Sequence, residues 1–325
     1  MQPTRNMQRA AKDLLRRYAE DRRDRRRAGS YKPLQCHVKL DRVIITAREV
    51  PLQELGKIPG YRAKPAKRLW KKLYREVTRI YGTGSIRKIF IESGPNVGWL
   101  PKFRISIIPP DTTGLLLEDL GFILELIAEF KLVLVEIALD LPLDSIVDTS
   151  FVRQHMLAGK TRLRPGGNVL HERWGSARSS KVVRAYAKFE ASSFRIEFQL
   201  NARFLRKHGI NHASDFPKLA TILSSHHIYF AALDDNKLRE YLRRSRLPAK
   251  TKTSILKTVA ESRKSLWSTL RLLRRKWHFT NVRRLLVPLP AMNRIVVAAL
   301  NEWATQWQTH SSLRAVDKTR EQQTQ

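Results

Sequence analysis

Three short segments of this chain alternate between apolar and polar residues, and this alternation limits the fold more than any other feature. They are 135–141 (VEIALDL), 182–189 (VVRAYAKF) and 194–200 (FRIEFQL). Residues two positions apart in a strand point to the same face of a sheet. The pattern therefore predicts three half-buried strands, with an apolar core on one face of the sheet and a charged surface on the other.

Further patterns predict more strands and helices around these three segments. Strands are expected within 35–50, where β-branched residues form a run, and at 88–92, 103–108 and 168–174. Apolar residues at helical spacing predict helices over 65–81 and 116–131. Because hairpin-length connections join the later strands, we expect an α+β fold in which helices pack on one face of a largely antiparallel sheet.

Charge and periodicity divide the chain into four regions. A basic helix is expected in 1–30, the α+β domain in 31–212, a basic helical region in 213–309 and a polar tail in 310–325. Between Lys237 and Arg284 there are sixteen Lys or Arg residues and two acids. Apolar residues recur among them at helical spacing, which predicts several basic amphipathic helices.

The chain carries 62 Lys and Arg against 29 Asp and Glu, a formal net charge of +33. So large an excess indicates a polyanionic partner, with nucleic acid ahead of a membrane surface. The single cysteine, Cys36, excludes a disulfide framework and a cysteine-rich zinc site. We expect a cytoplasmic protein without a signal peptide or a membrane span, since 1–30 is basic and charges interrupt the most apolar stretch, 115–141.

If the three alternating strands are neighbours, one face of the sheet brings scarce acidic side chains together with a tyrosine. The side chains on that face are Glu136, Asp140, Arg184, Tyr186, Lys188, Arg195 and Glu197. Carboxylate oxygens suit Mg²⁺ or Mn²⁺, and such an ion can polarise a phosphoryl oxygen for attack by a tyrosine. The alternative is a solvated face on which opposite charges pair across the strands.

A Gly-Ser turn with two cations, 174–181, lies just before the second alternating strand. Its backbone N–H groups, together with Ser176 and Arg178, can hold a phosphate. An ordinary connection between two strands has the same composition, so this turn alone does not distinguish the two interpretations.

Taken in order, these segments resemble the replication initiation factor family, which comprises rolling-circle initiators of plasmids and filamentous phages and related relaxases of conjugative elements. The resemblance covers roughly 38–205. It rests on an Ile-Ala-hydrophobic-Asp strand end (137–140), an aromatic-Gly-Ser loop with Arg (174–179), an Arg-x-Tyr-x-Lys strand (184–188) and an Arg-hydrophobic-Glu strand (195–197). The chain departs from the family at Ala187, where Asp is usual, and at the inserted Ala177.

The resemblance implies an enzyme that nicks and rejoins origin DNA through a tyrosine joined to the 5′ phosphate, with a divalent metal. Carried onto this sequence, Tyr186 is the nucleophile, and Lys188 and Arg184 act at the scissile phosphate. Asp140, Glu197 and Glu136 then hold Mg²⁺ or Mn²⁺. Further DNA or phosphate contacts are expected from Ser176, Arg178, Arg195, Arg243, Arg244, Arg274, Arg275 and Lys276.

The partner that the resemblance implies is origin DNA, single-stranded or in a cruciform at the nick site. A host helicase and a second copy of this chain are further candidate partners, and no membrane is expected. A non-catalytic, sequence-specific DNA-binding protein on the same fold, marking an origin or repressing a promoter, stays open and is favoured by Ala187. RNA binding is disfavoured, because the strand faces carry charge rather than paired aromatic residues.

Overall fold

The computed structural model describes most of the chain. The described residues are 35–57, 62–65, 73–82, 85–110, 114–127, 129–142, 151, 155–156, 163–165, 171–175, 178–188, 193–226, 230–260, 266–277, 279 and 281–323. The basic helix expected in 1–30 lies outside these residues.

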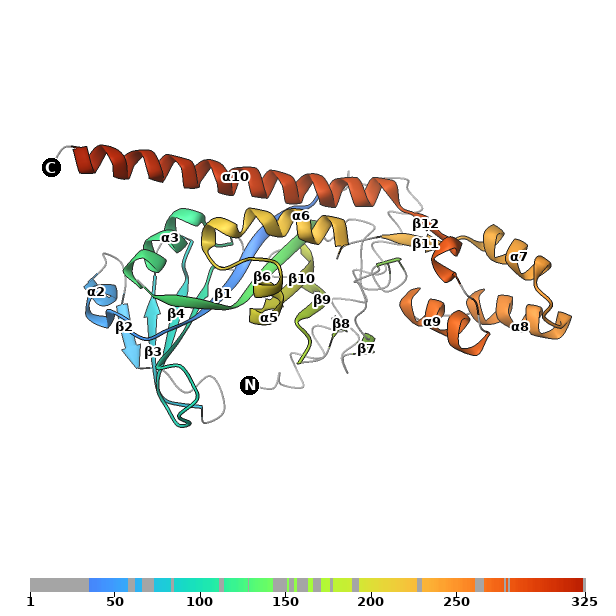
Figure 1. Ribbon diagram of the computed structural model, residues 1–325, viewed down its shortest axis with the longest axis horizontal. Helices are drawn as coiled ribbons and strands as arrows, with labels where there is room; N and C mark the ends of the chain where they lie inside the picture. The colour runs from blue at the N-terminus through green and yellow to red at the C-terminus, as the bar shows by residue number, and fades with distance from the viewer. Residues whose placement is uncertain are drawn as a thin grey trace.

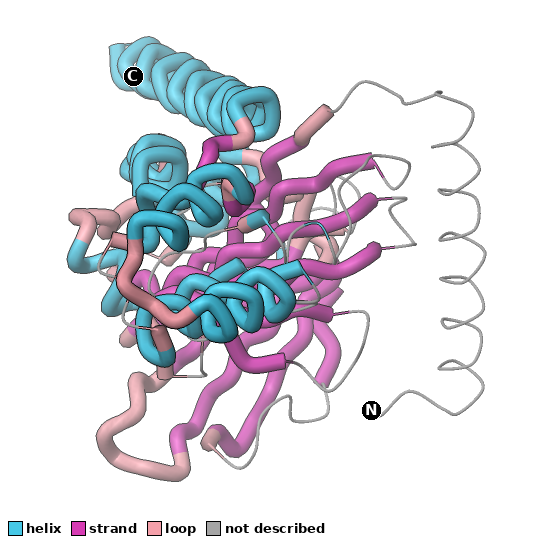
Figure 2. Tube along the Cα trace, turned by 90° about the vertical axis from the view of Figure 1, so that its right-hand side faces the viewer, coloured by secondary structure: helices cyan, strands magenta, loops and turns pink. Residues whose placement is uncertain are grey.

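Ten antiparallel strands form one sheet (Figure 1). In the order in which they lie side by side, they are β2 (Arg62–Pro65), β3 (Tyr74–Tyr81), β4 (Lys88–Pro95), β5 (Phe103–Ile108), β1 (His37–Ala47), β6 (Phe130–Pro142), β10 (Ser193–Asn201), β9 (Lys181–Lys188), β8 (His171–Trp174) and β7 (Leu163–Pro165). Figure 2 looks at the molecule from one end and shows these strands side by side. The expected α+β class with a largely antiparallel sheet is confirmed.

Helices pack against one face of the sheet and enclose the main core. They are α3 (Leu117–Leu126), α5 (Ala202–Lys207), α6 (Pro217–His226) and α10 (Pro290–Gln323), while the short α2 (Leu52–Lys57) and the 3-10 turn η2 (Ala213–Asp215) connect elements. Inward-facing residues of the central strands, such as Ile137 and Phe198, form one buried cluster with Leu219 of α6 and Leu300 of α10. The long α10 runs along α6 (Figure 1).

A smaller unit is inserted between α6 and α10, and we call residues 231–288 the helical module. It contains α7 (Asp235–Arg244), α8 (Ala249–Ala260), α9 (Leu266–Lys276) and the 3-10 turn η3 (Val282–Leu285). Its ends pair as β11 (Ala231–Leu233) and β12 (Leu286–Pro288), so the module leaves and rejoins the main body at one place. Its buried residues, including Leu238, Ile255 and Leu273, form a second cluster.

One expected helix is wrong. Of the expected range 65–81, residue 65 ends β2 and residues 74–81 form β3 rather than a helix, while 66–72 lie outside the described residues. In β3, Val77 pairs with Glu92 on the polar face of the sheet, whereas Ile80 pairs with Ile89 on the core face. Both side chains are buried, so the apolar spacing that imitated a helix comes from a strand covered on its two faces.

Other boundaries differ from expectation. The helix expected over 116–131 ends at Leu126, because Phe130 already pairs with Ala47 as the first residue of β6. The helical region expected from residue 213 contributes to two hydrophobic cores. Residues of α6 and α10 pack in the core of the sheet, whereas the helical module has a separate core of its own. The expected polar tail continues α10 as far as Gln323. Within the part of the chain that the structure describes, no helix is long and apolar enough to cross a membrane.

Candidate active site

The charged face predicted from alternation is present on four adjacent strands, β1, β6, β10 and β9. Arg195 of β10 pairs with Asp140 of β6 on one side and with Tyr186 of β9 on the other. Directly paired residues point to the same face of an antiparallel sheet. The register therefore places all seven expected side chains, Glu136, Asp140, Arg184, Tyr186, Lys188, Arg195 and Glu197, on the face opposite the helical core.

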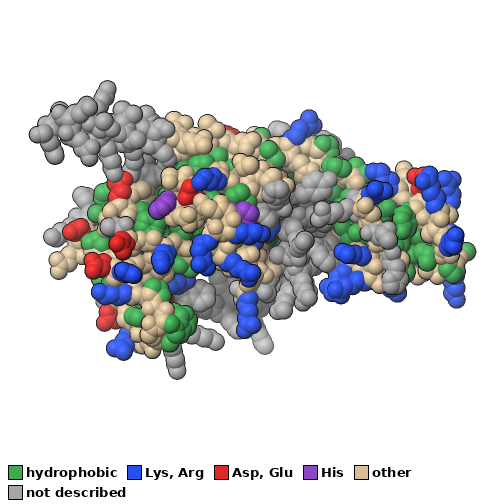
Figure 3. Space-filling model, in the orientation of Figure 1, with side chains coloured by type: hydrophobic (Ala, Val, Ile, Leu, Met, Phe, Trp, Pro, Cys, Tyr) green, Lys and Arg blue, Asp and Glu red, His purple; other side chains and the backbone are tan. Residues whose placement is uncertain are grey.

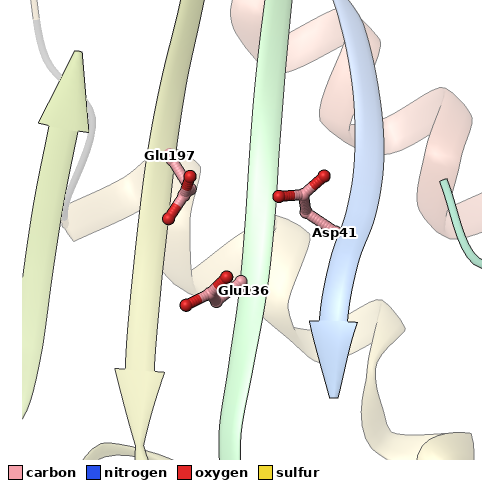
Figure 4. A group of neighbouring side chains, drawn as sticks. All are labelled: Asp41, Glu136 and Glu197. Atoms are coloured by element: carbon pink, nitrogen blue, oxygen red, sulfur yellow. The ribbon is translucent and has the colours of Figure 1, made fainter. Parts of the chain in front are cut away.

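A β-bulge in β1 adds an eighth side chain that the alternation did not predict, that of Asp41. Leu40 pairs with Ile137 and Arg42 pairs with Glu136, so Asp41 is an extra residue between two regular pairs. A bulge of this kind can turn a side chain toward a site beside the strand. Figure 4 shows the Asp41 carboxylate directed across β6 toward those of Glu136 and Glu197.

One carboxylate oxygen from each of Asp41, Glu136 and Glu197 lies within 4.8 Å of the other two. Glu136 and Glu197 are each only 1% exposed. Burial, and then repulsion from Glu197, raise the pKa of Glu136 to about 7, although Arg42, Arg184 and Gln199 act in the opposite direction. Burial and the neighbouring Glu197 therefore disfavour the ionised form of Glu136.

The Tyr186 hydroxyl lies beside this group of acids. It donates a hydrogen bond of 2.9 Å to Oε2 of Glu197. Burial raises the pKa of Tyr186 above its usual value, and the charge and hydrogen bond of Glu197 raise it further. The phenol is consequently held in its protonated form, with its proton directed at a carboxylate that can accept it.

Two arginines neutralise the two glutamates. Nη2 of Arg184 forms an ion pair with Oε1 of Glu197 and lies 3.6 Å from Oε1 of Glu136. Nε of Arg42 lies 3.5 Å from Oε2 of Glu136, and Nε2 of Gln199 donates a hydrogen bond of 2.5 Å to Oε1 of the same carboxylate. Arg184 thus bridges the two acids from the side of β9.

Arg195, which we expected to contact phosphate, is fully buried. Its Nε and Nη2 donate hydrogen bonds of 2.6 and 2.7 Å to the two oxygens of Asp140, and its Nη1 donates one of 2.6 Å to Asp41. This geometry corrects the expectation, because a guanidinium enclosed by two carboxylates is not placed to meet DNA. Its position instead holds Asp41 in place.

Asp140, one of the expected metal ligands, lies outside the group of three carboxylates. Besides Arg195, it forms an ion pair of 3.2 Å with Nζ of Lys39. Burial alone would raise the pKa of Asp140, but the hydrogen bonds and charges of Arg195 and Lys39 outweigh burial and hold it below the usual value. Asp41 takes the place in the carboxylate group that the sequence motif suggested for Asp140.

The group of three carboxylates could hold a divalent cation, because its candidate ligand atoms are all hard oxygen atoms of the kind that Mg²⁺ and Mn²⁺ prefer. One of them, Oε2 of Glu136, is buried and accepts no hydrogen bond from the described part of the chain. Asp41, Glu136 and Glu197 therefore fit a divalent cation better than the expected set of Asp140, Glu197 and Glu136.

The other expected site residues lie apart from these acids. Lys188 is on the same face of β9 as Tyr186 and is buried, whereas Arg178 is exposed before β9 begins. Ser176 lies outside the described residues. The basic residues expected to contact DNA are exposed on the helical module, Arg243 and Arg244 on α7 and Arg274, Arg275 and Lys276 on α9.

Asp41 is the functional candidate that sequence reasoning missed. The signal was present, because Leu40 and Val43 are both apolar and both fully buried, but two polar residues separate them instead of one. That interruption of the alternation marks an extra residue in the strand.

The sequence matches no protein-family model and none of the curated proteins with which it was compared.

Proposed function

We propose that this protein nicks and rejoins one strand of DNA, as a rolling-circle replication initiator does, with Tyr186 as the nucleophile. One observation carries the proposal: the Tyr186 hydroxyl donates to Glu197, and Glu197 belongs to a group of three carboxylates suited to a divalent cation. Asp41, Glu136 and Glu197 would hold Mg²⁺ or Mn²⁺. The bound cation would supply positive charge to the phosphoryl oxygens.

In the proposed nicking step, the phenolic oxygen of Tyr186 attacks the phosphorus atom of a phosphodiester. Its proton passes to Oε2 of Glu197, which already accepts a hydrogen bond from it. The bond from phosphorus to the 3′ oxygen breaks, and the leaving oxygen keeps the electron pair and takes a proton from water, while Glu197 returns its proton to the hydroxide that this leaves. Rejoining reverses these steps, with a 3′ hydroxyl attacking the phosphotyrosine.

The proposed DNA partner is supported by charge on the helical module. Figure 3 shows Lys and Arg side chains gathered over the end of the molecule that α7, α8 and α9 form. Each phosphate that Lys or Arg neutralises releases a bound counterion, so a surface of this kind binds DNA with strong salt dependence. Lys188, two residues from Tyr186 on the same face of β9, would contact the scissile phosphate, and Arg178, exposed in the turn before β9, would contact a phosphate farther along the strand.

A second candidate function is non-catalytic DNA binding on the same fold. The observation that favours it is the pairing of every carboxylate in the site with a cation of the chain itself, Lys39, Arg42, Arg184 or Arg195. In this second function the ion-pair network has a purely structural role in the sheet, and the helical module provides all of the DNA contacts.

The experiment is a search for a covalent protein–DNA adduct. The protein is incubated with labelled single-stranded DNA from its own replicon and Mg²⁺ or Mn²⁺, then run on a denaturing gel. We expect an adduct that requires metal and is lost in Tyr186→Phe. The matched control is Tyr81→Phe, which removes a hydroxyl from a strand at the far side of the sheet.

Two results would contradict the proposal. An adduct that persists in Tyr186→Phe would keep the nicking activity but assign it to another residue. Salt-sensitive DNA binding without an adduct, for every substrate and both metals, would establish the non-catalytic function instead.

A further inference from the structure

The polar layer around Tyr186 is electrically balanced by its own side chains. Four carboxylates, those of Asp41, Glu136, Asp140 and Glu197, form ion pairs with four cations, those of Lys39, Arg42, Arg184 and Arg195. Lys188, buried on the same face, adds further positive charge. A divalent cation bound to this layer alone would therefore leave it with an excess of at least two positive charges.

Excess charge is costly here because the layer is shielded from water. Glu136 and Glu197 are almost completely buried, and like charges repel more strongly where the effective dielectric constant is low. The backbone phosphates of a bound DNA strand each carry one negative charge. The scissile phosphate and its neighbouring phosphates would offset this excess, so the cation and the DNA should favour one another.

Arg184 is the side chain of this layer whose position allows it to respond to both the divalent cation and the DNA. Its side chain is 26% exposed, whereas the side chains of Glu136 and Glu197 that it bridges are 1% and 2% exposed. It is two residues from Tyr186 on the same face of β9, so its guanidinium lies at the rim of the layer beside the nucleophile. An arginine fork can exchange a carboxylate for a phosphate, because it binds both with the same geometry.

We propose that Arg184 is an internal counter-ion that competes with the divalent cation for Glu136 and Glu197, and that turns to a DNA phosphate when DNA binds. This inference rests on the proposed function for its ligands. Its consequence is that the cation and DNA bind cooperatively, each raising the affinity for the other by the same factor. Without DNA, Arg184 holds the cation affinity low and keeps the two glutamates ordered.

The test measures Mn²⁺ affinity of the full chain at pH 8, by the loss of the free Mn²⁺ signal in electron paramagnetic resonance. In the absence of DNA, Arg184→Gln should bind Mn²⁺ about tenfold more tightly than the wild type, since a competing positive charge is removed. Arg184→Lys should stay near the wild-type affinity, because it retains the charge. The matched control is Arg104→Gln, which removes an arginine paired with Glu92 on the same face but away from the three carboxylates.

Cooperativity is measured in a Tyr186→Phe background, which prevents cleavage. A single-stranded oligonucleotide should raise the Mn²⁺ affinity of Tyr186→Phe about tenfold, and this gain should largely disappear when Arg184→Gln is added. Urea unfolding of each variant separates these effects from a loss of structure. Equal Mn²⁺ affinity in Arg184→Gln and the wild type, or an equal gain from DNA with and without Arg184, would overturn the inference.

These outcomes are separable from failure of the proposed function. Tighter Mn²⁺ binding by Arg184→Gln without any covalent adduct would support the counter-ion role and refute the nicking reaction. An adduct that requires metal, together with unchanged Mn²⁺ affinity in Arg184→Gln, would support nicking and refute the counter-ion role. An absence of Mn²⁺ binding in every variant, with or without DNA, would overturn both the counter-ion role and the metal site.

Discussion

Glu136 has the least favourable electrostatic position of any carboxylate described in the site. It is almost fully buried and faces Glu197, and these two causes raise its pKa from 4.5 to about 7. At neutral pH the folded protein therefore holds a partly protonated glutamate that would be ionised in the unfolded chain. Residues kept in this state are more common at functional sites than elsewhere.

The first prediction concerns the pH dependence that Glu136 imposes on stability. Because its pKa is raised on folding, the folded state binds more protons than the unfolded state between pH 4.5 and about 7. Its contribution to the free energy of unfolding is complete below pH 4.5 and is lost as the pH rises through about 7. At about 1.4 kcal/mol per pH unit, the loss is on the order of 3 kcal/mol.

Urea unfolding of the wild type and Glu136→Gln, in EDTA between pH 5 and pH 8, measures this effect. The variant should gain stability relative to the wild type as the pH rises. Glu302→Gln, at an exposed position of α10, is the control and should show a constant difference. A constant difference for Glu136→Gln as well would refute the assigned pKa.

At the scale of elements, the bulge in β1 decides which acids meet. A regular strand has no position for Asp41 between Leu40 and Arg42, since these two residues already occupy alternate faces opposite Ile137 and Glu136. The extra residue keeps Leu40 and Val43 in the core and adds a carboxylate to the polar face. The hydrogen bond from Arg195 then fixes that carboxylate beside the two glutamates.

The second prediction is that Asp41 can be deleted without unfolding the sheet. Removing it leaves Leu40 and Arg42 on their present faces, so the register on both sides is kept. The cost in the free energy of unfolding should be on the order of 2 kcal/mol, because one hydrogen bond between charged groups is removed. Mn²⁺ affinity should fall about tenfold or more, as it should in Asp41→Asn.

Deletion of Ser106 is the control for this experiment. Ser106 lies in β5, which pairs regularly with both of its neighbours, so its loss would turn half of the strand to the wrong face. We expect this deletion to prevent folding. If the Asp41 deletion is equally damaging in urea unfolding, the bulge is structural rather than a device for placing a carboxylate.

At the scale of the whole molecule, the structure separates the polar layer from the basic surface. The helical module begins and ends at the paired strands β11 and β12, and its core is distinct from that of the sheet. Asn293 of α10 anchors this junction, because its side chain hydrogen-bonds to both the backbone N–H and the carbonyl oxygen of Phe230. Surface charge on the module can therefore be changed without altering the three carboxylates.

The third prediction concerns salt dependence. Replacing Arg243, Arg244, Arg274 and Arg275 by Gln should reduce the slope of log affinity against log salt by about 0.9 for each duplex phosphate that the variant no longer neutralises. Fluorescence anisotropy with a labelled duplex, over a series of NaCl concentrations, measures the slope. Arg203→Gln with Arg206→Gln, exposed on α5, is the control, and an equal change in that control would show that the module has no special part in DNA binding.

The sequence by itself determined the features that depend on near neighbours. Alternation over a few residues separated the two faces of β6, β9 and β10, and helical spacing among basic residues predicted the helices of the module. Both are local properties, because side-chain direction in a strand or helix follows from the backbone of that element alone. The same local rule failed for β3, where Val77 and Ile80 are buried on opposite faces and imitate a helix.

Only the tertiary structure decided which charges meet. Asp41 and Arg195 are 154 residues apart in the chain, and they touch because β1 and β10 both pair with β6. The same strand order places Asp140 beside Arg195 and Lys39. Asp140 therefore lies outside the carboxylate group that its motif suggested. Pairing between distant strands is set by the whole sheet, so the composition of the site could not be derived from any single segment.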